Sequence, residues 1–180
     1  MKILMSSYSC ETNRGSEPGV GWNWLTSLAN QGHEVHALIY PIDRPNIEQY
    51  LKEYPIPNLK FIYVPTSGFM DRFYLRTSKL IYIHYFYWQI LAFFKAKALL
   101  KTQDFDLVHH ITMGSFRIPS WMGFLGLPFI FGPVGGGEEA APSLVKNLPL
   151  KFRIKEFIRS LANKLAVWNP LMFLTFRSSS

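Results

Sequence analysis

The amino-acid sequence predicts an α/β protein in which helices cover both faces of an open, mainly parallel sheet. Short apolar runs alternate with segments of helical periodicity along most of the chain, and glycine or proline follows several of them. No internal repeat or low-complexity linker interrupts this order. The 180 residues suffice for about one domain, and 48% apolar residues against 17% charged residues provide for its core.

The first forty residues predict one β-α-β unit. Residues 2–8 form a short apolar run, which predicts a strand, and a glycine-bearing loop over residues 11–21 follows it. Apolar residues recur every three or four positions over residues 20–30, which predicts a helix that Gly32 ends. Residues 34–40 are rich in β-forming residues and predict a second, parallel strand.

The alternation continues to residue 131. The further predicted elements are a strand over residues 60–64, a helix over 82–101, a strand over 106–112, a short helix over 120–125 and a strand over 129–131. This order is that of a Rossmann-like, doubly wound sheet, which we assign to residues 1–180. No strand is expected after Pro170, so we expect the sheet to be the first part of a larger protein.

Two segments raise the question of a membrane. Residues 80–94 contain no Asp, Glu, Lys or Arg, but they are shorter than the roughly 20 apolar residues that a membrane span needs. We expect a helix there that packs in the core or lies on a membrane surface. Residues 151–168 predict a basic amphipathic helix, which binds an anionic membrane or packs on the sheet or on another domain. The formal charge of +7 favours anionic partners in general.

The first glycine segment is a candidate ligand loop. Three glycines in seven residues would let backbone approach a ligand, while the following helix points its positive end at a phosphate. The residues predicted to bind there are Gly15, Ser16, Glu17, Gly19 and Gly21. A tight strand-to-helix turn without a ligand is the alternative interpretation.

The fourth strand and the second glycine segment supply the other candidates. His109 and His110 point to opposite faces of the sheet because side chains alternate along a strand. One of them can therefore reach the cleft in which such sheets bind ligands, at the carboxyl ends of their strands. A satisfied core histidine is the alternative for each. Thr112 ends the strand. Three successive glycines and a carboxylate then follow the last strand and suit sugar hydroxyls; they are Gly135, Gly136, Gly137 and Glu138.

Other motifs are excluded or weak. No phosphate loop of the G-x-x-x-x-G-K-[ST] type occurs, and Trp24 stands where the dinucleotide pattern G-x-G-x-x-G needs its third glycine. Asp43 lies near the spacing of a ribose-binding acid, which keeps a dinucleotide-dependent oxidoreductase open as an alternative. The D-x-D pair of Asp104 and Asp106 precedes its strand and predicts a capped turn rather than a metal site. Cys10 is the only cysteine, and with no export signal predicted this favours a reducing cytoplasm.

Several segments together resemble the amino-terminal domain of family-4 glycosyltransferases of the GT-B fold. These segments are KILMSSYS, RGSEPGVGW, NQGHEVHALIY, DLVHHIT and PFIFGPVGGGEEAAP, and they span nearly the whole chain. The resemblance implies one half of a two-domain architecture, with the acceptor-side domain present. The family's E-x7-E motif does not occur here. We therefore expect the carboxyl-terminal nucleotide-sugar domain to be absent from these 180 residues and the isolated chain to be inactive.

The resemblance also implies an activity and its residues. A retaining transferase would move a sugar from a nucleotide sugar to a glycan or lipid-linked acceptor in cell-surface polysaccharide synthesis, without a metal or another cofactor. His109 would contact the transferring sugar, and the first glycine segment would contact the donor phosphates and the acceptor. His110, Thr112 and the second glycine segment would lie on the acceptor side.

The implied location is cytoplasmic, peripheral at the inner face of the membrane, and no nucleic-acid partner is expected. A module that binds a membrane surface without catalysis is the alternative from another functional class.

Overall fold

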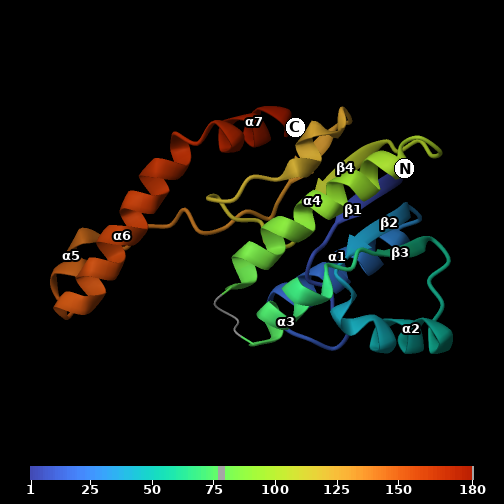
Figure 1. The fold of residues 1–180 in the computed structure, drawn as a ribbon, viewed down its shortest axis with the longest axis horizontal. Coiled ribbons are helices and arrows are strands. Elements are labelled where there is room, and N and C mark those ends of the chain that lie inside the picture. The colour runs from blue at the N-terminus through green and yellow to red at the C-terminus, as the bar shows by residue number, and fades with distance from the viewer. Residues whose placement is uncertain (77–79, 180) are drawn as a thin grey trace.

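The computed structural model describes residues 1–76 and 80–179 and confirms the α/β prediction (Figure 1). Five parallel strands form one sheet in the order β3-β2-β1-β4-β5. They are β1 (Lys2–Ser6), β2 (Glu34–Ile39), β3 (Leu59–Tyr63), β4 (Leu107–His110) and β5 (Phe129–Phe131). All five were predicted, and the sheet with its flanking helices is Rossmann-like. Ser180, the last residue of the predicted domain, lies outside the described residues.

Seven α-helices and two 3₁₀ turns are found in the described part of the chain. They are α1 (Ser16–Asn30), η1 (Pro41–Asp43), α2 (Arg44–Glu53), α3 (Gly68–Arg76), α4 (Ile81–Leu99), η3 (Trp121–Leu125), α5 (Pro142–Lys146), α6 (Leu150–Val167) and α7 (Pro170–Ser178). Four of the helices, α2, α3, α5 and α7, were not predicted. Helix α1 begins four residues earlier than expected, so most of the first glycine segment is helical.

The sheet buries a different set of side chains on each face. Ile3 and Met5 of β1 pack with Leu25 of α1 and Ile47 of α2, whereas Leu4, between them in sequence, packs with the helix α4 on the other face. This is the alternation that a strand imposes on its side chains. Burial on both faces explains why β1 and β2 are largely apolar along their whole length.

The aromatic run of residues 80–94 lies almost entirely in α4, and its side chains on one side of the helix are core. Tyr85 and Trp88 are at most 1% exposed and pack against the sheet, whereas Tyr82, Ile83 and Phe94 are exposed. Among the described residues, no helix combines the length and the apolar character that crossing a bilayer requires.

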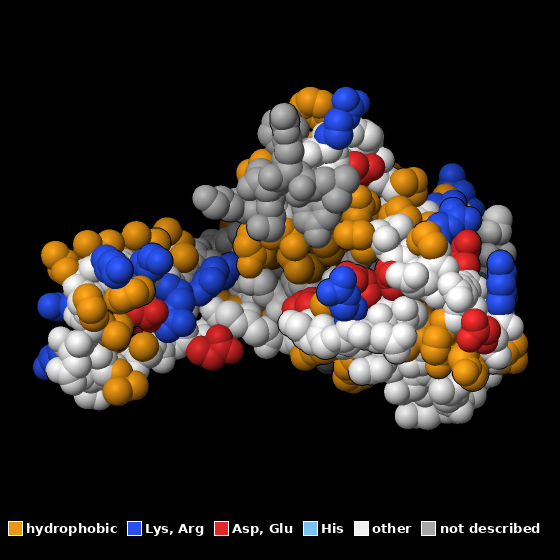
Figure 2. Space-filling model, turned by 90° about the horizontal axis from the view of Figure 1, so that it is seen from below, with side chains coloured by type: hydrophobic (Ala, Val, Ile, Leu, Met, Phe, Trp, Pro, Cys, Tyr) orange, Lys and Arg blue, Asp and Glu red, His pale blue; other side chains and the backbone are white. Residues whose placement is uncertain are grey.

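After β5 the chain leaves the sheet and forms a lobe of its own. Helices α5 and α6 project from the sheet (Figure 1) and form the lobe at the left of Figure 2. Helix α7 returns to contact β5. Helix α7 is anchored by Thr175, whose hydroxyl contacts the backbone of Ser120 before η3, and by a bridge between Ser179 and Phe129 of β5. The contacts between this part of the chain and the sheet are made mainly by α7, and α5 and α6 pack mainly against each other and α7.

Candidate functional site

Three loops meet at the carboxyl ends of β1, β4 and β5, where open α/β sheets bind their ligands. The first loop is residues 7–17, which end in the first turn of α1, the second is residues 111–120, and the third is residues 132–141. The backbone N–H of Ser9 donates to Thr112 Oγ1 (3.1 Å), and the N–H of Met113 donates to the carboxylate of Glu17. The N–H of Gly135 donates to the carbonyl oxygen of Gly114 (2.9 Å), which links the third loop to the second. The structure thus brings both glycine segments and the end of β4 together.

Six of the predicted site residues lie at the surface of these loops. Gly15, Ser16 and Glu17 are exposed at the start of α1, whose N-cap Gly15 forms no side-chain capping hydrogen bond. The exposed residues of the third loop are Gly135, Gly137 and Glu138. Half-buried Gly136 has φ +90°, and its N–H donates to Glu138 Oε2 (3.0 Å). Backbone N–H groups and two carboxylates are therefore available to a polar ligand.

Gly19 and Gly21 do not face a ligand, and the structure corrects this part of the prediction. Both are buried inside α1. A Cβ on Gly19 would lie 2.1 Å from the carbonyl oxygen of Arg14, and one on Gly21 would lie 2.2 Å from that of Ser9. The missing side chains allow the loop after β1 to fold against the helix. The close approach that the glycines allow is to the chain itself.

Backbone strain is concentrated in two of the loops. Asn13, Ser16 and Met113 have φ between +55° and +58°, a conformation that costs a non-glycine residue of order 1 kcal/mol or more. Asn13 and Ser16 belong to the first loop and Met113 to the second. Strain of this kind often marks binding and catalytic loops, because the surrounding structure has to hold it in place.

His110 occupies the core and is not accessible to an acceptor, which corrects its assignment to the acceptor side. It is 1% exposed, and its Nε2 lies 2.9 Å from the carbonyl oxygen of Thr112 and 2.8 Å from the hydroxyl of Tyr85. Its Nδ1 lies 2.7 Å from the hydroxyl of Ser120. Burial lowers the pKa of His110 to about 4 against the opposing effect of its backbone hydrogen bond. The ring is a neutral member of a buried polar network.

His109 points to the α1 face, opposite to His110, as predicted. It is 6% exposed, its ring meets that of Trp24 edge to face, and its Nε2 donates to the carbonyl oxygen of Gly132 (2.9 Å). Burial lowers its pKa, and the hydrogen bond to Gly132 opposes the shift. Together with the 41% exposed Ile130, it lines a hollow of about 430 Å³ on the sheet face. Contact of His109 with a transferring sugar stays a prediction.

The carboxylates of Asp43 and Asp106, which the sequence analysis also considered, form hydrogen bonds within the protein. Asp43 is 8% exposed and accepts hydrogen bonds from the backbone N–H of Thr12 (2.9 Å) and from the side chain of Asn46 (2.5 Å). It therefore holds the first loop against α2. Asp106 accepts a hydrogen bond from the backbone N–H of Lys2 (2.6 Å) at the amino end of the sheet, so its carboxylate bonds to β1 and does not cap its own turn.

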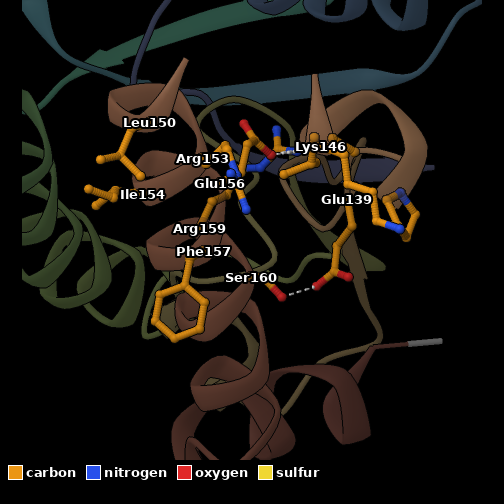
Figure 3. Close-up of a pocket in the computed structure, with 12 residues that line it drawn as sticks. Glu139, Lys146, Leu150, Arg153, Ile154, Glu156, Phe157, Arg159 and Ser160 are labelled. Atoms are coloured by element: carbon orange, nitrogen blue, oxygen red, sulfur yellow. Dashed lines mark hydrogen bonds and ion pairs between the residues drawn. The ribbon is translucent and has the colours of Figure 1, made fainter. Parts of the chain in front are cut away.

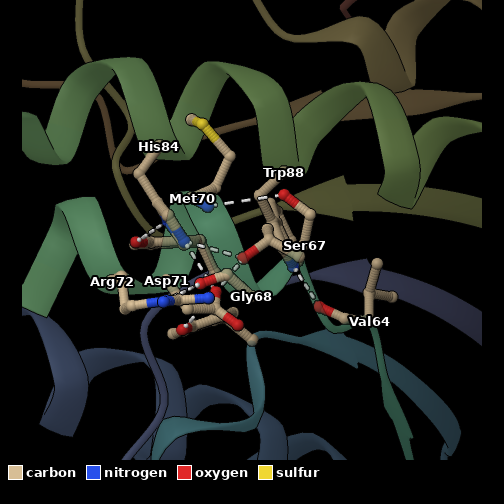
Figure 4. A network of polar contacts seen from close by, with 11 residues as sticks. Val64, Ser67, Gly68, Met70, Asp71, Arg72, His84 and Trp88 are labelled. Carbon is tan, nitrogen blue, oxygen red and sulfur yellow. Dashed lines mark hydrogen bonds and ion pairs between the residues drawn. The ribbon is translucent and has the colours of Figure 1, made fainter.

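A pair formed by the buried His84 and the partly exposed Asp71, beside the first strands, was missed by the sequence analysis. His84 of α4 lies 3.3 Å from Asp71 Oδ1 of α3 (Figure 4). His84 also lies 2.8 Å from the hydroxyl of Tyr8, and Tyr40 donates to Asp71 (3.0 Å). Partial burial raises the pKa of Asp71, but hydrogen bonds from Thr66, Tyr40 and His84 outweigh it and the pKa is lowered.

This network fixes the positions of α3 and α4 beside the loops that follow β1 and β2. His84 is only 1% exposed, so its ring is a positioning group in this structure. No spacing in the sequence relates these residues. The available signal was a histidine inside a largely apolar part of α4.

A second hollow lies in the lobe that follows the third loop. It measures about 500 Å³ and lies between α5 and α6 (Figure 3). Ser160 of α6 donates to Glu139 Oε1 (2.9 Å), and the side chain of Asn163 donates to the carbonyl oxygen of Gly137 (3.3 Å). The polar side of α6 therefore holds the end of the third loop.

Comparison with known proteins adds no family to this geometry: a scan against protein-family models found no matching family, and searches of curated proteins and of solved structures found no match. Within residues 1–76 and 80–179, no group of three or more His, Cys, Asp or Glu side chains is arranged to hold a metal ion.

Proposed function

We propose that this chain is the acceptor-side, Rossmann-like part of a glycosyltransferase that uses a nucleotide sugar. The observation that carries the proposal is the meeting of the two glycine segments with the end of β4. The links are the Glu17–Met113 and Gly135–Gly114 hydrogen bonds. The resemblance to family-4 glycosyltransferases rests on these same segments. A glycan or lipid-linked acceptor, retention of configuration and independence of metal belong to the proposal.

The chemistry offered by the loops suits positioning rather than covalent catalysis. Exposed backbone at the start of α1 suits the phosphates of the donor, since the first turn of a helix leaves N–H groups free. Glu138 and the exposed glycines suit hydroxyl groups of an acceptor. Such a site accelerates transfer by orienting two substrates and by stabilising the departing diphosphate.

The dinucleotide-dependent oxidoreductase is less well supported. Its ribose-binding carboxylate would be Asp43, and that side chain is buried and already hydrogen-bonded to Thr12 and Asn46. Trp24 additionally occupies the position of the third glycine of the motif. Both features oppose the pyrophosphate and ribose contacts that define this class.

The proposal includes a cytoplasmic location, peripheral at the inner face of a membrane. The net charge of +7 and the basic helix α6 support it. A membrane-surface module without catalysis would use the same helix. The transferase and the non-catalytic module therefore differ in what they predict for the three loops, not in what they predict for α6.

Protein-observed NMR with UDP-glucose, GDP-mannose and NAD tests the proposal. We expect a nucleotide sugar to shift backbone amides of residues 12–17, 113–116 and 135–138, with weak affinity because only one side of the donor is held. Gly136→Val is expected to weaken this binding about tenfold or more, since a side chain at φ +90° deforms the third loop.

Gly126→Val is the matched control, because Gly126 also has a positive φ, of +77°, and lies at the end of η3 with open space around it. Both variants should lose similar stability, on the order of 1 kcal/mol or more, but only Gly136→Val should lose binding. Tighter binding of NAD than of either nucleotide sugar would favour the oxidoreductase. Shifts confined to other parts of the chain, or none, would contradict the proposed site.

A further inference from the structure

Helix α6 leaves its apolar face uncovered by the described residues of this chain. The large side chains of this face are 46% to 84% exposed; they are Leu150, Ile154, Phe157, Leu161, Leu165 and, just beyond the last turn, Trp168. The buried residues of α6 are Asn163 and Ala166, and Asn163 bonds to Arg117 of the second loop (2.8 Å) as well as to Gly137. A helix that only covered its own domain would bury the apolar face instead.

Basic side chains border the apolar face on both sides. With about 3.6 residues per turn, one edge carries two lysines and the other an arginine and a lysine; they are Lys151, Lys155, Arg153 and Lys164. Residues 142–167 contain six Lys or Arg and a single acidic residue, Glu156, which pairs with Arg159 (2.6 Å). Figure 2 shows blue basic side chains among orange apolar ones on this lobe.

We propose that α6 docks the protein on an anionic phospholipid bilayer. The outward apolar side chains enter the boundary between headgroups and acyl chains, and the bordering Lys and Arg side chains reach lipid phosphates. Trp168, the most exposed of the apolar residues, lies at the end of the helix, where an indole ring anchors in the interface. A second copy of the chain is a poor occupant, because two basic helices facing each other would repel.

The hollow between α5 and α6 gives this surface a place for a phosphate. Leu150, Ile154 and Phe157 line it on the apolar side (Figure 3). Its charged lining consists of Lys146, Arg153 and Arg159 together with two carboxylates, Glu156, which pairs with Arg159, and Glu139, which accepts a hydrogen bond from Ser160, so one more basic than acidic side chain lines it. An apolar wall beside cationic side chains matches the junction of an acyl chain with its phosphate headgroup. The docking does not depend on sugar transfer.

Vesicle co-sedimentation of the 180-residue chain tests the docking. We expect binding to vesicles of phosphatidylglycerol and phosphatidylcholine, weaker binding to phosphatidylcholine alone, and a decline as salt rises from about 0.05 M to 0.5 M. Lys151→Glu with Lys155→Glu is expected to lower binding about tenfold or more, because each basic residue near an anionic surface adds to the attraction. Lys52→Glu with Lys101→Glu makes the same change of charge at exposed residues on α2 and beyond α4, and should have a smaller effect.

A fluorescent probe identifies the face that enters the lipid. With Cys10 buried, an environment-sensitive dye on Leu161→Cys is expected to shift to the blue on anionic vesicles, whereas a dye on Asn30→Cys is not. Circular dichroism checks that every variant is folded. Equal binding to neutral vesicles, or no shift at residue 161, would overturn the proposal. So would dimerisation in solution that Phe157→Glu abolishes without any vesicle binding, because the face would then be an interface between copies of the chain.

Discussion

Replacing Gly21 by alanine is expected to destabilise the protein by about 3 kcal/mol or more. The new Cβ would lie 2.2 Å from the carbonyl oxygen of Ser9 and 2.6 Å from the hydroxyl of Ser7, and 3.1 Å from a carbon of Thr112. Alanine is favoured over glycine within a helix by only about 1 kcal/mol, so the collision with backbone decides the sign. Urea unfolding at neutral pH measures the change.

Gly68→Ala is the control for this prediction. Gly68 also lies in a helix, at the start of α3, but a Cβ there meets nothing within 4 Å. We expect its stability to stay the same or to rise by up to about 1 kcal/mol. A Gly21→Ala variant as stable as Gly68→Ala would mean that the first loop shifts freely, and the structural role assigned to Gly21 would be wrong.

The sequence predicted the sheet well because the central strands are short, largely apolar runs that are buried on both faces. It predicted the helices less well. Residues 44–53 contain few apolar residues, of which Ile47 alone is fully buried, so α2 has little periodic signal. Helix α7 packs on η3 and β5 through Met172 and Thr175. Such contacts are tertiary, and no local pattern in the sequence encodes them.

The candidate site was also predicted only in part. The closely spaced glycines correctly predicted that the backbone is closely approached there by other atoms. They did not show that Gly19 and Gly21 approach the first loop of the chain itself and not a ligand. Strand alternation correctly separated His109 from His110. The pair of His84 and Asp71 was missed because two of its hydrogen-bond partners, Tyr8 and Tyr40, are distant from it in sequence. The sequence also did not determine what the apolar face of α6 contacts, because an amphipathic pattern predicts that such a face exists and not what covers it.

Acidification from pH 7 to pH 5 is expected to lower the free energy of unfolding by about 2 kcal/mol, because of His110. Burial lowers its pKa from 6.5 to about 4, so the unfolded chain takes up a proton between these values and the folded protein does not. Stability then falls by about 1.4 kcal/mol per pH unit below 6.5, and this loss is complete below pH 4. The pKa of His109 is also lowered by burial, which acts in the same direction.

Carboxylates act in a different range and do not obscure this prediction. Asp71, whose pKa is lowered from 3.8, stabilises the fold above that value and loses its contribution only as the pH falls further. Urea unfolding at half-unit steps between pH 7 and pH 5 therefore isolates the histidines.

The variant His110→Gln removes the main titrating group from the buried network. It is expected to cost about 2 to 4 kcal/mol at pH 7, because hydrogen bonds to Tyr85 and Ser120 are lost or weakened inside the core. Its stability should nevertheless change much less between pH 7 and pH 5 than that of the original protein. The fall in stability has to be compared over the same pH range in both proteins. If the variant kept the full fall, the sensitivity would arise elsewhere, and a neutral His110 at the centre of the core would not explain the response of this fold to acid.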